Sequence, residues 1–291
     1  MNALLPVLDR RWLTRARIRA RAGEALQDEI ARRLLERLDL IRLDPQRVLD
    51  LSWDHWMTRP ALAVRYPHSQ VITASPMLMP APRPRRRAWF VRAAEPLLIA
   101  HADRLPLPDA SVDLLFSNLL LPWYDDLDAV FAAAKRILRP GGLFLFSSLG
   151  PDSLQELRRA WAEVDDTIHI QVFIDMHDVG DALLRAGFAD PVMDMEMVTL
   201  TYGTINGLLG ELRAAGSRNV LRERRESLTG KQRWRAMQQA YEAQRQQERL
   251  PVSFEVVYGH AWKLETPPRM QTDVHEVRIP VARIGRRPPG V

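Results

Sequence analysis

Residues 101–158 decide the fold: HADRLPLPDASVDLLFSNLLLPWYDDLDAVFAAAKRILRPGGLFLFSSLGPDSLQELR. Residues 112–120 form a nearly continuous apolar run, the pattern of a strand that is covered on both faces. Asp125 or Asp126 is expected to cap the helix that follows, and the Pro-Gly-Gly turn at 140–142 is expected to end it. A second buried apolar run comes directly afterwards. This strand–helix–strand unit predicts a parallel sheet with a right-handed crossover.

The rest of the chain continues the alternation of strands and helices. Further strands are predicted at 47–51, 70–74, 89–92, 142–149, 197–202 and 253–263. Further helices are predicted at 152–161, with Asp152 as its cap, and from the cap Asp175 to Gly187. Two more helices, within 204–216 and 230–247, precede the last strand.

Composition narrows the classes of function. The 291 residues carry a net charge of +5 and contain no cysteine, which excludes disulfides, thiolate metal sites and thiol catalysis. The seven histidines lack metal-ligand spacing, so no metal is expected. No apolar run is long enough to cross a membrane and no secretory signal is visible, so a cytoplasmic location is expected.

The N-terminal region is rich in arginine. Residues 10–21 hold six arginines and are expected to form a helix that runs on to about residue 41. Two interpretations stay open: a solvated basic face on a packing helix, or a docking patch for an acidic partner.

Several segments resemble a known family. Residues 102–118 and 134–158 are similar to the second half of class I methyltransferases, and most similar to the malonyl-acyl carrier protein (ACP) O-methyltransferases of biotin synthesis. The resemblance resumes in FIDMHDVGDALLRAGFADPVMDME (173–196) and in RLPVSFEVVYGHAWK (249–263). It extends over about residues 25–265.

The resemblance implies an α/β, Rossmann-like class I methyltransferase fold with helical lid elements. Its seven-stranded, mostly parallel sheet would have the order 3-2-1-4-5-7-6, with the last strand in the chain antiparallel. The implied organisation is an N-terminal helical lid at 1–45, a methyltransferase-like domain at 46–265 with a helical insertion at about 204–248, and a flexible tail at 266–291.

The resemblance also implies S-adenosylmethionine (SAM) at the carboxyl ends of strands 1, 2 and 4. Such sites use glycines after strand 1, an acidic side chain after strand 2 for the ribose, and another after strand 3 for the adenine. Here the glycine-rich turn is replaced by SWDHW (52–56), no acidic residue occurs between Asp54 and Glu95, and the family's lid Tyr-Asp pair aligns with Ala20 and Arg21. The candidate cofactor-binding residues are Asp50, Ser52, Ser75, His101 and Asp103. Two alternatives stay open: SAM bound in an unusual way, or a SAM-independent protein whose indoles fill the cofactor position.

The acceptor side matches the family better. The candidate substrate-binding residues are Asn118, Trp123, Tyr124, Arg158 and His177. Each also has a purely structural interpretation: Trp123 and Tyr124 as anchors of a turn, Arg158 as a surface arginine, and His177 as a neighbour of a helix cap. No catalytic residue is assigned.

By resemblance, the protein would transfer a methyl group from SAM to the carboxylate of a malonyl thioester on ACP, and the basic lid would suit that acidic partner. The alternative is a non-catalytic member of the fold that acts as a binding or assembly partner. Nucleic acid is the less favoured partner, because the arginine clusters at 10–21 and 83–87 lie on separate segments and match no recognised motif.

Overall fold

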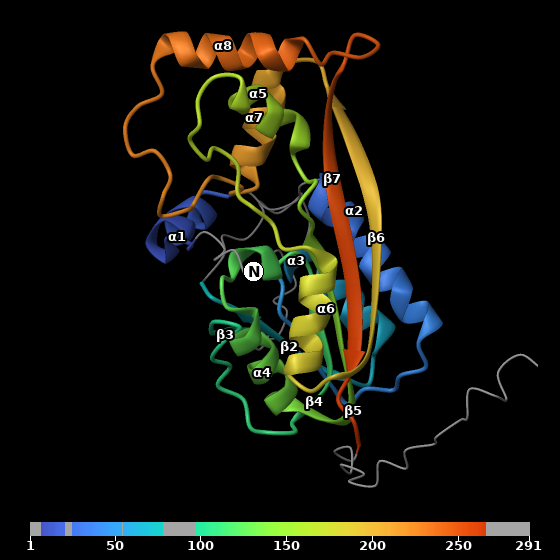
Figure 1. Cartoon of the computed structure of the whole chain (residues 1–291). Helices are drawn as coiled ribbons and strands as arrows, with labels where there is room; N and C mark the ends of the chain where they lie inside the picture. The colour runs from blue at the N-terminus through green and yellow to red at the C-terminus, as the bar shows by residue number, and fades with distance from the viewer. Residues whose placement is uncertain (1–6, 21–24, 54, 78–96, 266–291) are drawn as a thin grey trace, which may run out of the picture.

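A computed structural model describes residues 7–20, 25–53, 55–77 and 97–265. Its centre is a seven-stranded sheet with the order β3-β2-β1-β4-β5-β7-β6 (Figure 1). The strands are β1 (Arg47–Asp50), β2 (Gln70–Ser75), β3 (Leu97–Ile99), β4 (Val112–Ser117), β5 (Leu138–Leu149), β6 (Ala189–Tyr202) and β7 (Leu250–Trp262). Strands β1 to β5 are parallel, and β7 runs antiparallel to both β5 and β6. The predicted sheet order is confirmed.

The helices cover both faces of the sheet. They are α1 (Arg10–Ile18), α2 (Ala25–Arg37), α3 (His55–Arg65), α4 (Leu127–Ile137), α5 (Gln155–Ala162), α6 (Met176–Arg185), α7 (Ile205–Ala214) and α8 (Lys231–Glu242), with 3-10 turns η1 (Leu38–Leu40) and η2 (Leu121–Trp123). Leu115 on β4 packs with α4 and α6 on one face, whereas Leu114 and Phe116 pack with α2, α3 and α5 on the other. Burial on both faces explains why the strand sequences are almost continuously apolar.

Two predicted helix caps are correct. Asp126 Oδ1 accepts a hydrogen bond from the Ala129 amide at 2.9 Å and caps α4, and Asp175 Oδ1 accepts from the His177 amide at 2.8 Å and caps α6. The cap predicted at Asp152 is wrong. Helix α5 starts after Leu154, which has a positive φ of 60°, and the Asp152 amide instead donates to Glu255 on β7.

Other predicted boundaries are shifted. Helix α4 ends at Ile137 rather than at the Pro-Gly-Gly turn, because the sheet recruits residues 138–142: Leu138 pairs with Val112, and the Gly141 amide donates to the Lys263 carbonyl at 2.7 Å. Strand β6 begins at Ala189, eight residues before the predicted start at 197.

The N-terminal helix is not continuous. Helix α1 ends at Ile18, and α2 begins at Ala25. The strand predicted at 89–92 and the tail at 266–291 lie outside the described residues, and the strand beside β2 is β3 at Leu97–Ile99.

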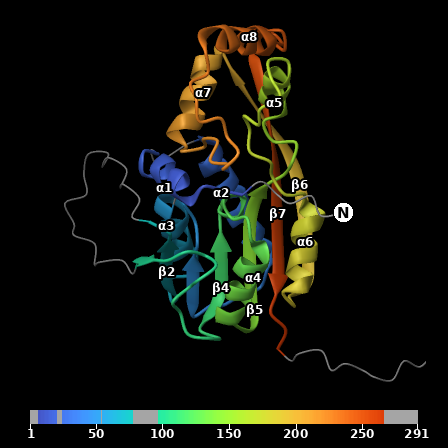
Figure 2. The same cartoon turned by 60° about the vertical axis from the view of Figure 1, so that its left-hand side comes forward.

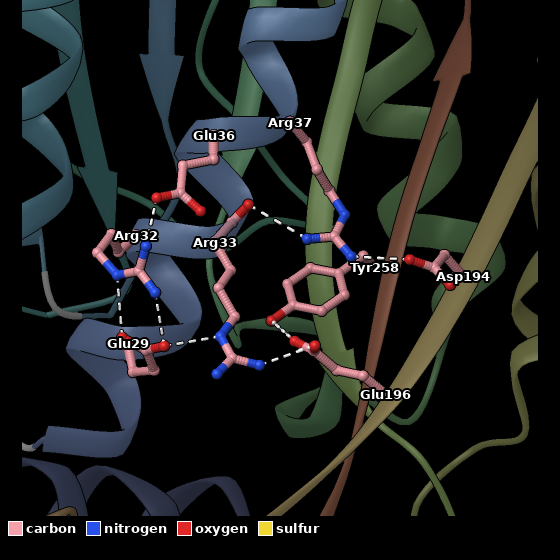
Figure 3. A network of polar contacts seen from close by, with 8 residues as sticks. All are labelled: Glu29, Arg32, Arg33, Glu36, Arg37, Asp194, Glu196 and Tyr258. Carbon is pink, nitrogen blue, oxygen red and sulfur yellow. Dashed lines mark hydrogen bonds and ion pairs between the residues drawn. The ribbon is translucent and has the colours of Figure 1, made fainter.

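Helix α2 is fastened to the antiparallel edge of the sheet by a polar network (Figure 3). Arg33 pairs with Glu196 at 2.7 Å, Arg37 pairs with Asp194 at 2.8 Å, and the Tyr258 hydroxyl donates to Glu196 at 2.6 Å. The Arg37 guanidinium also lies 3.5 Å from the centre of the Tyr258 ring. Burial raises the pKa of Glu196, but the hydrogen bonds from Tyr258 and Arg33 outweigh it, so the net pKa is below the usual value.

Helices α5, α7 and α8 gather over one end of β6 and β7, and α1 lies between this group and the parallel strands (Figures 1 and 2). Helices from both ends of the chain therefore lie near the carboxyl ends of β1 and β4. None of the helices that the structure describes is long and apolar enough to cross a membrane.

Candidate functional site

Asn118 joins the strand ends at the centre of the site. The backbone amide of Asn118 donates to Ser52 Oγ at 3.0 Å. In its side chain, Oδ1 accepts from Ser147 Oγ at 2.7 Å and Nδ2 donates to the Gln27 carbonyl at 3.3 Å. These bonds connect the segments that follow β1 and β4 with β5 and α2. Because the side-chain oxygen and nitrogen are both engaged, Asn118 braces the floor of the site.

The candidate cofactor residues at the ends of β1 and β2 are completely buried. Asp50 ends β1, Ser52 lies two residues later and Ser75 ends β2; each has an exposure of 0%. Asp50 Oδ2 accepts a hydrogen bond of 2.5 Å from Thr58 Oγ1 of α3, which ties the strand to the next helix. The end of β2 carries the Ser75 hydroxyl where the family pattern has a carboxylate.

The candidate adenine segment after β3 is held by other parts of the chain. Asp103 pairs with Arg10 of α1 at 3.2 Å, and the Ala102 amide donates to the Tyr124 hydroxyl at 2.9 Å. Burial raises the pKa of Tyr124 to about 12, so this hydroxyl stays protonated at neutral pH. His101, which directly precedes Ala102, is exposed.

Arg17 lies between two indoles above the strand ends. Its guanidinium carbon is 4.1 Å from the centre of the Trp123 ring and 4.9 Å from that of Trp53, and Nη1 donates to the Ala215 carbonyl at 3.0 Å. The exposures of the three side chains are 3% for Arg17, 4% for Trp53 and 8% for Trp123. A guanidinium is the cation best suited to stacking on aromatic faces.

Neither interpretation of the basic segment anticipated a buried arginine. The signal was present in the spacing: the buried side of α1 and its end is formed by Leu13, Ala16, Arg17 and Ala20, which follow helical periodicity. Arg17 is therefore part of the packing stripe, and the exposed basic residues of the helix are Arg10, Arg11 and Arg15.

SAM, the cofactor implied by the fold, can be tested against these residues. The turn after β1 presents a buried indole, Trp53, where glycines would let the ligand approach the backbone. The Ser75 hydroxyl at the end of β2 cannot replace a carboxylate that binds two ribose hydroxyls. In the part of the chain that the structure describes, these residues do not fit the usual mode of SAM binding.

Trp123 also lines a cavity of about 320 Å³. Its lining is mainly apolar and aromatic, with Leu157 and Trp161 of α5, Leu209 of α7 and Trp234 of α8. Polar groups occur at only a few points: His169, Gln171, Arg213, Arg218 and their neighbours Ser217 and Asn219. A concave apolar site with a few oriented polar groups is typical of small-ligand binding.

His169 and Gln171 are fixed in this wall. The His169 ring stacks on Trp161, with centroids 3.6 Å apart and planes 9° apart, and its Nε2 lies 2.7 Å from Asp165 Oδ1. Gln171 is 7% exposed; its Nε2 donates to the Pro122 carbonyl, and its Oε1 has no hydrogen-bond partner in the described part of the chain.

The structure places the candidate acceptor residues in different surroundings. Trp123 lines the cavity, and Tyr124 points away from it, toward Ala102. Arg158 donates to the carbonyls of Pro151, Ser153 and Gln171 at 2.9, 3.2 and 3.4 Å, and burial lowers its pKa. It therefore supports the segment that carries Gln171.

His177 lies apart from this group, at the start of α6. It is largely exposed, and its Nδ1 is 2.7 Å from Asp175 Oδ1. The sequence did not single out Gln171, Arg213 or Arg218, which come together only when the loop before α6 meets the end of α7. Among the described residues, no cluster of histidine and acidic side chains could hold a metal ion.

Comparisons with known proteins agree with a methyltransferase fold. A profile described as a methyltransferase domain matches residues 69–146. Two solved structures, a methyltransferase from Bacillus halodurans and YcgJ from Bacillus subtilis, have TM-scores of 0.53 and 0.52. Each is 12% identical and covers 81% of this chain; the alignments span 99% and 100% of the two solved chains. At this identity they show the fold alone.

Curated relatives are much more similar in sequence. The malonyl-[acyl-carrier protein] O-methyltransferase of Laribacter hongkongensis is 44% identical over 85% of this chain and 86% of its own. The proteins of the same name from Gallionella capsiferriformans and Xylella fastidiosa are each 42% identical, over 92% and 98% of this chain and 94% and 97% of their own. Similarity of this extent, on the observed class I methyltransferase fold, shows that the chain belongs to the malonyl-ACP O-methyltransferase family.

Proposed function

We propose that this protein binds a malonyl-type acyl thioester presented by an acyl carrier protein, in the cavity beside Trp123, without transferring a methyl group from SAM. The acyl thioester is the acceptor for which the curated relatives are named. The observation that carries the proposal is the mainly apolar cavity of about 320 Å³ that Trp123 lines, while the buried Arg17 contacts the same indole.

The cavity suits a short acyl group on a flexible arm. Trp161, Leu209 and Trp234 provide apolar surface that excludes water, and Gln171 and His169 provide oriented polar atoms. A malonyl carboxylate is already a nucleophile, so the acceptor half of the family reaction requires binding and orientation rather than a base. The side chains of this cavity supply both without a dedicated proton acceptor.

A second candidate function is the complete family reaction, SAM-dependent methylation of malonyl-ACP. The observation that favours it is the 44% identity to a relative named for that activity, extending over most of both chains. Methyltransferase family membership supports SAM as the donor, and this candidate requires Arg17 and Trp53 to move away from the strand ends.

Two measurements separate the candidates. Malonyl-ACP is titrated into the full-length protein and followed by calorimetry, and the same mixture is incubated with SAM that carries a radiolabelled methyl group. We expect saturable binding and no transfer of label. Labelled malonyl-ACP would establish the second candidate, and the absence of any binding of malonyl-ACP would overturn the proposal.

Calorimetry with SAM alone tests the donor side directly. We expect no heat of binding up to millimolar SAM, because losing two charge-assisted contacts weakens affinity by about 10²–10⁴-fold. Acetyl-ACP is the matched control for the acyl group, because it lacks the carboxylate of malonyl-ACP and keeps the same carrier.

A further inference from the structure

Two arginines stand at the mouth of the cavity. Arg213 is in the last turn of α7, Arg218 follows five residues later, and both side chains line the cavity while remaining exposed to solvent. Within the described residues neither forms an ion pair. Burial, and then the charges of Arg213 and Arg19, lower the pKa of Arg218. Because the positive charges of Arg213 and Arg218 influence one another, an anion that lies near both is attracted to the mouth of the cavity.

The turn between the two arginines is rigid. The Gly216 amide donates to the Arg213 carbonyl at 3.2 Å and the Ser217 amide to the Leu212 carbonyl at 2.9 Å, with Gly216 at a φ of 68°. A Cβ atom at Gly216 would lie 3.2 Å from the Ala16 carbonyl oxygen, so α1 packs directly against this turn. These contacts hold the backbone of the turn that carries Arg213 and Arg218, so less of its order has to be gained when a ligand binds.

Deeper in the cavity the polar group is an acceptor rather than a cation. Gln171 is 7% exposed, its Nε2 is engaged with the Pro122 carbonyl, and its Oε1 lacks a partner among the residues that the structure describes. A buried acceptor without a partner is costly. Because Oε1 itself has almost no accessible surface, a small rotation of the Gln171 side chain is needed to bring it to a ligand N–H group, which then satisfies it. Around it lie the apolar side chains of Leu157, Leu209 and Trp234.

The order of these groups from solvent inward is cationic, apolar, and then a hydrogen-bond acceptor. We infer that Arg213 and Arg218 bind the phosphate of a phosphopantetheine arm at the mouth of the cavity, and that Gln171 Oε1 accepts a hydrogen bond from an amide N–H of the arm. This inference rests on the proposed function, since such an arm is how a carrier protein presents its acyl group. Guanidinium pairs match phosphate geometry well.

The malonyl carboxylate is the other anion that the arginines could bind. The depth of the site favours the phosphate. An arm that enters from solvent leaves its phosphate at the exposed rim, where Arg213 and Arg218 lie, and carries its acyl end inward toward Trp123.

The test uses two soluble probes and the full-length protein. Malonyl-phosphopantetheine and malonyl-pantetheine differ only in the phosphate, and both can be titrated by tryptophan fluorescence, because Trp123, Trp161 and Trp234 line the cavity. We expect the phosphorylated probe to bind the wild-type protein at least about tenfold more tightly, since tenfold corresponds to one modest charge-assisted contact.

The double variant R213Q/R218Q should remove this difference between the probes and leave the affinity for malonyl-pantetheine nearly unchanged. The control R235Q removes an exposed arginine from α8, outside the cavity lining, and should keep the full difference. Circular dichroism establishes that each variant is folded, and Q171L should weaken both probes equally.

Each of the other outcomes overturns the inference. Equal wild-type affinity for the two probes would refute the phosphate assignment and leave the proposed function standing. An equal loss of affinity for both probes in R213Q/R218Q would assign the arginines to the malonyl carboxylate. If the wild-type protein bound neither probe nor malonyl-ACP, the proposed function would fail together with the inference.

Discussion

Replacing Arg17 with alanine tests the closed side of the site. Each desolvated cation–π contact, with Trp53 and with Trp123, contributes up to about 2 kcal/mol. The hydrogen bond from the charged guanidinium to the Ala215 carbonyl contributes about 1.5–3 kcal/mol. The cost of burying the guanidinium offsets part of this sum. We therefore expect R17A to lower the free energy of unfolding by about 2–4 kcal/mol.

The measurement is guanidinium chloride unfolding followed by far-UV circular dichroism, with tryptophan fluorescence as a second probe. The matched control is R15A on the same helix, whose guanidinium is exposed and 5.7 Å from the Trp12 ring centre. The control should change stability by less than about 0.5 kcal/mol. An R17A protein as stable as R15A would refute the reasoning that Arg17 is held between the two indoles.

Three further substitutions probe the supporting contacts. E196Q should lower the free energy of unfolding by about 1 kcal/mol at pH 7. Because the pKa of Glu196 is lower in the folded protein than in the unfolded chain, the stability difference between wild type and E196Q should shrink as the pH falls below about 4.5. Urea unfolding at several pH values measures it, and a difference that stays constant with pH would contradict the prediction. N118A removes two side-chain hydrogen bonds at the strand ends and should cost about 2–3 kcal/mol in the same assay. An unchanged stability would indicate that Asn118 serves ligand binding only. Y124F removes the hydroxyl that accepts a hydrogen bond from the Ala102 amide, and should lower the free energy of unfolding by about 1–2 kcal/mol without changing the affinity for malonyl-ACP. A loss of that affinity with unchanged stability would instead indicate that Tyr124 contacts the substrate.

Most strands and helices could be predicted from local sequence patterns, whereas the strand order was predicted from the family resemblance. Continuous apolar runs identify strands covered on both faces, and Asp126 and Asp175 cap helices through bonds that span two or three residues. The predicted ends of strands and helices were wrong where segments distant in the chain offer hydrogen-bond partners. Strand β5 begins at Leu138 because Leu138 pairs with Val112 and the backbone at Gly141 bonds to Lys263. Asp152 does not cap α5, and its amide donates a hydrogen bond to Glu255 of β7.

By itself, the sequence determined the family, the parallel sheet, and the replacement of glycine and acidic residues at the cofactor position, since these depend on residue types and their spacing. Only the tertiary structure decided that Arg17 packs between Trp53 and Trp123, and that Gln171 shares a cavity with Arg213. Such groups are far apart along the chain, and their contacts follow from how α1 and α7 pack over the strand ends. Composition assigns an arginine to the surface, but two buried aromatic faces and a carbonyl can hold it in the interior.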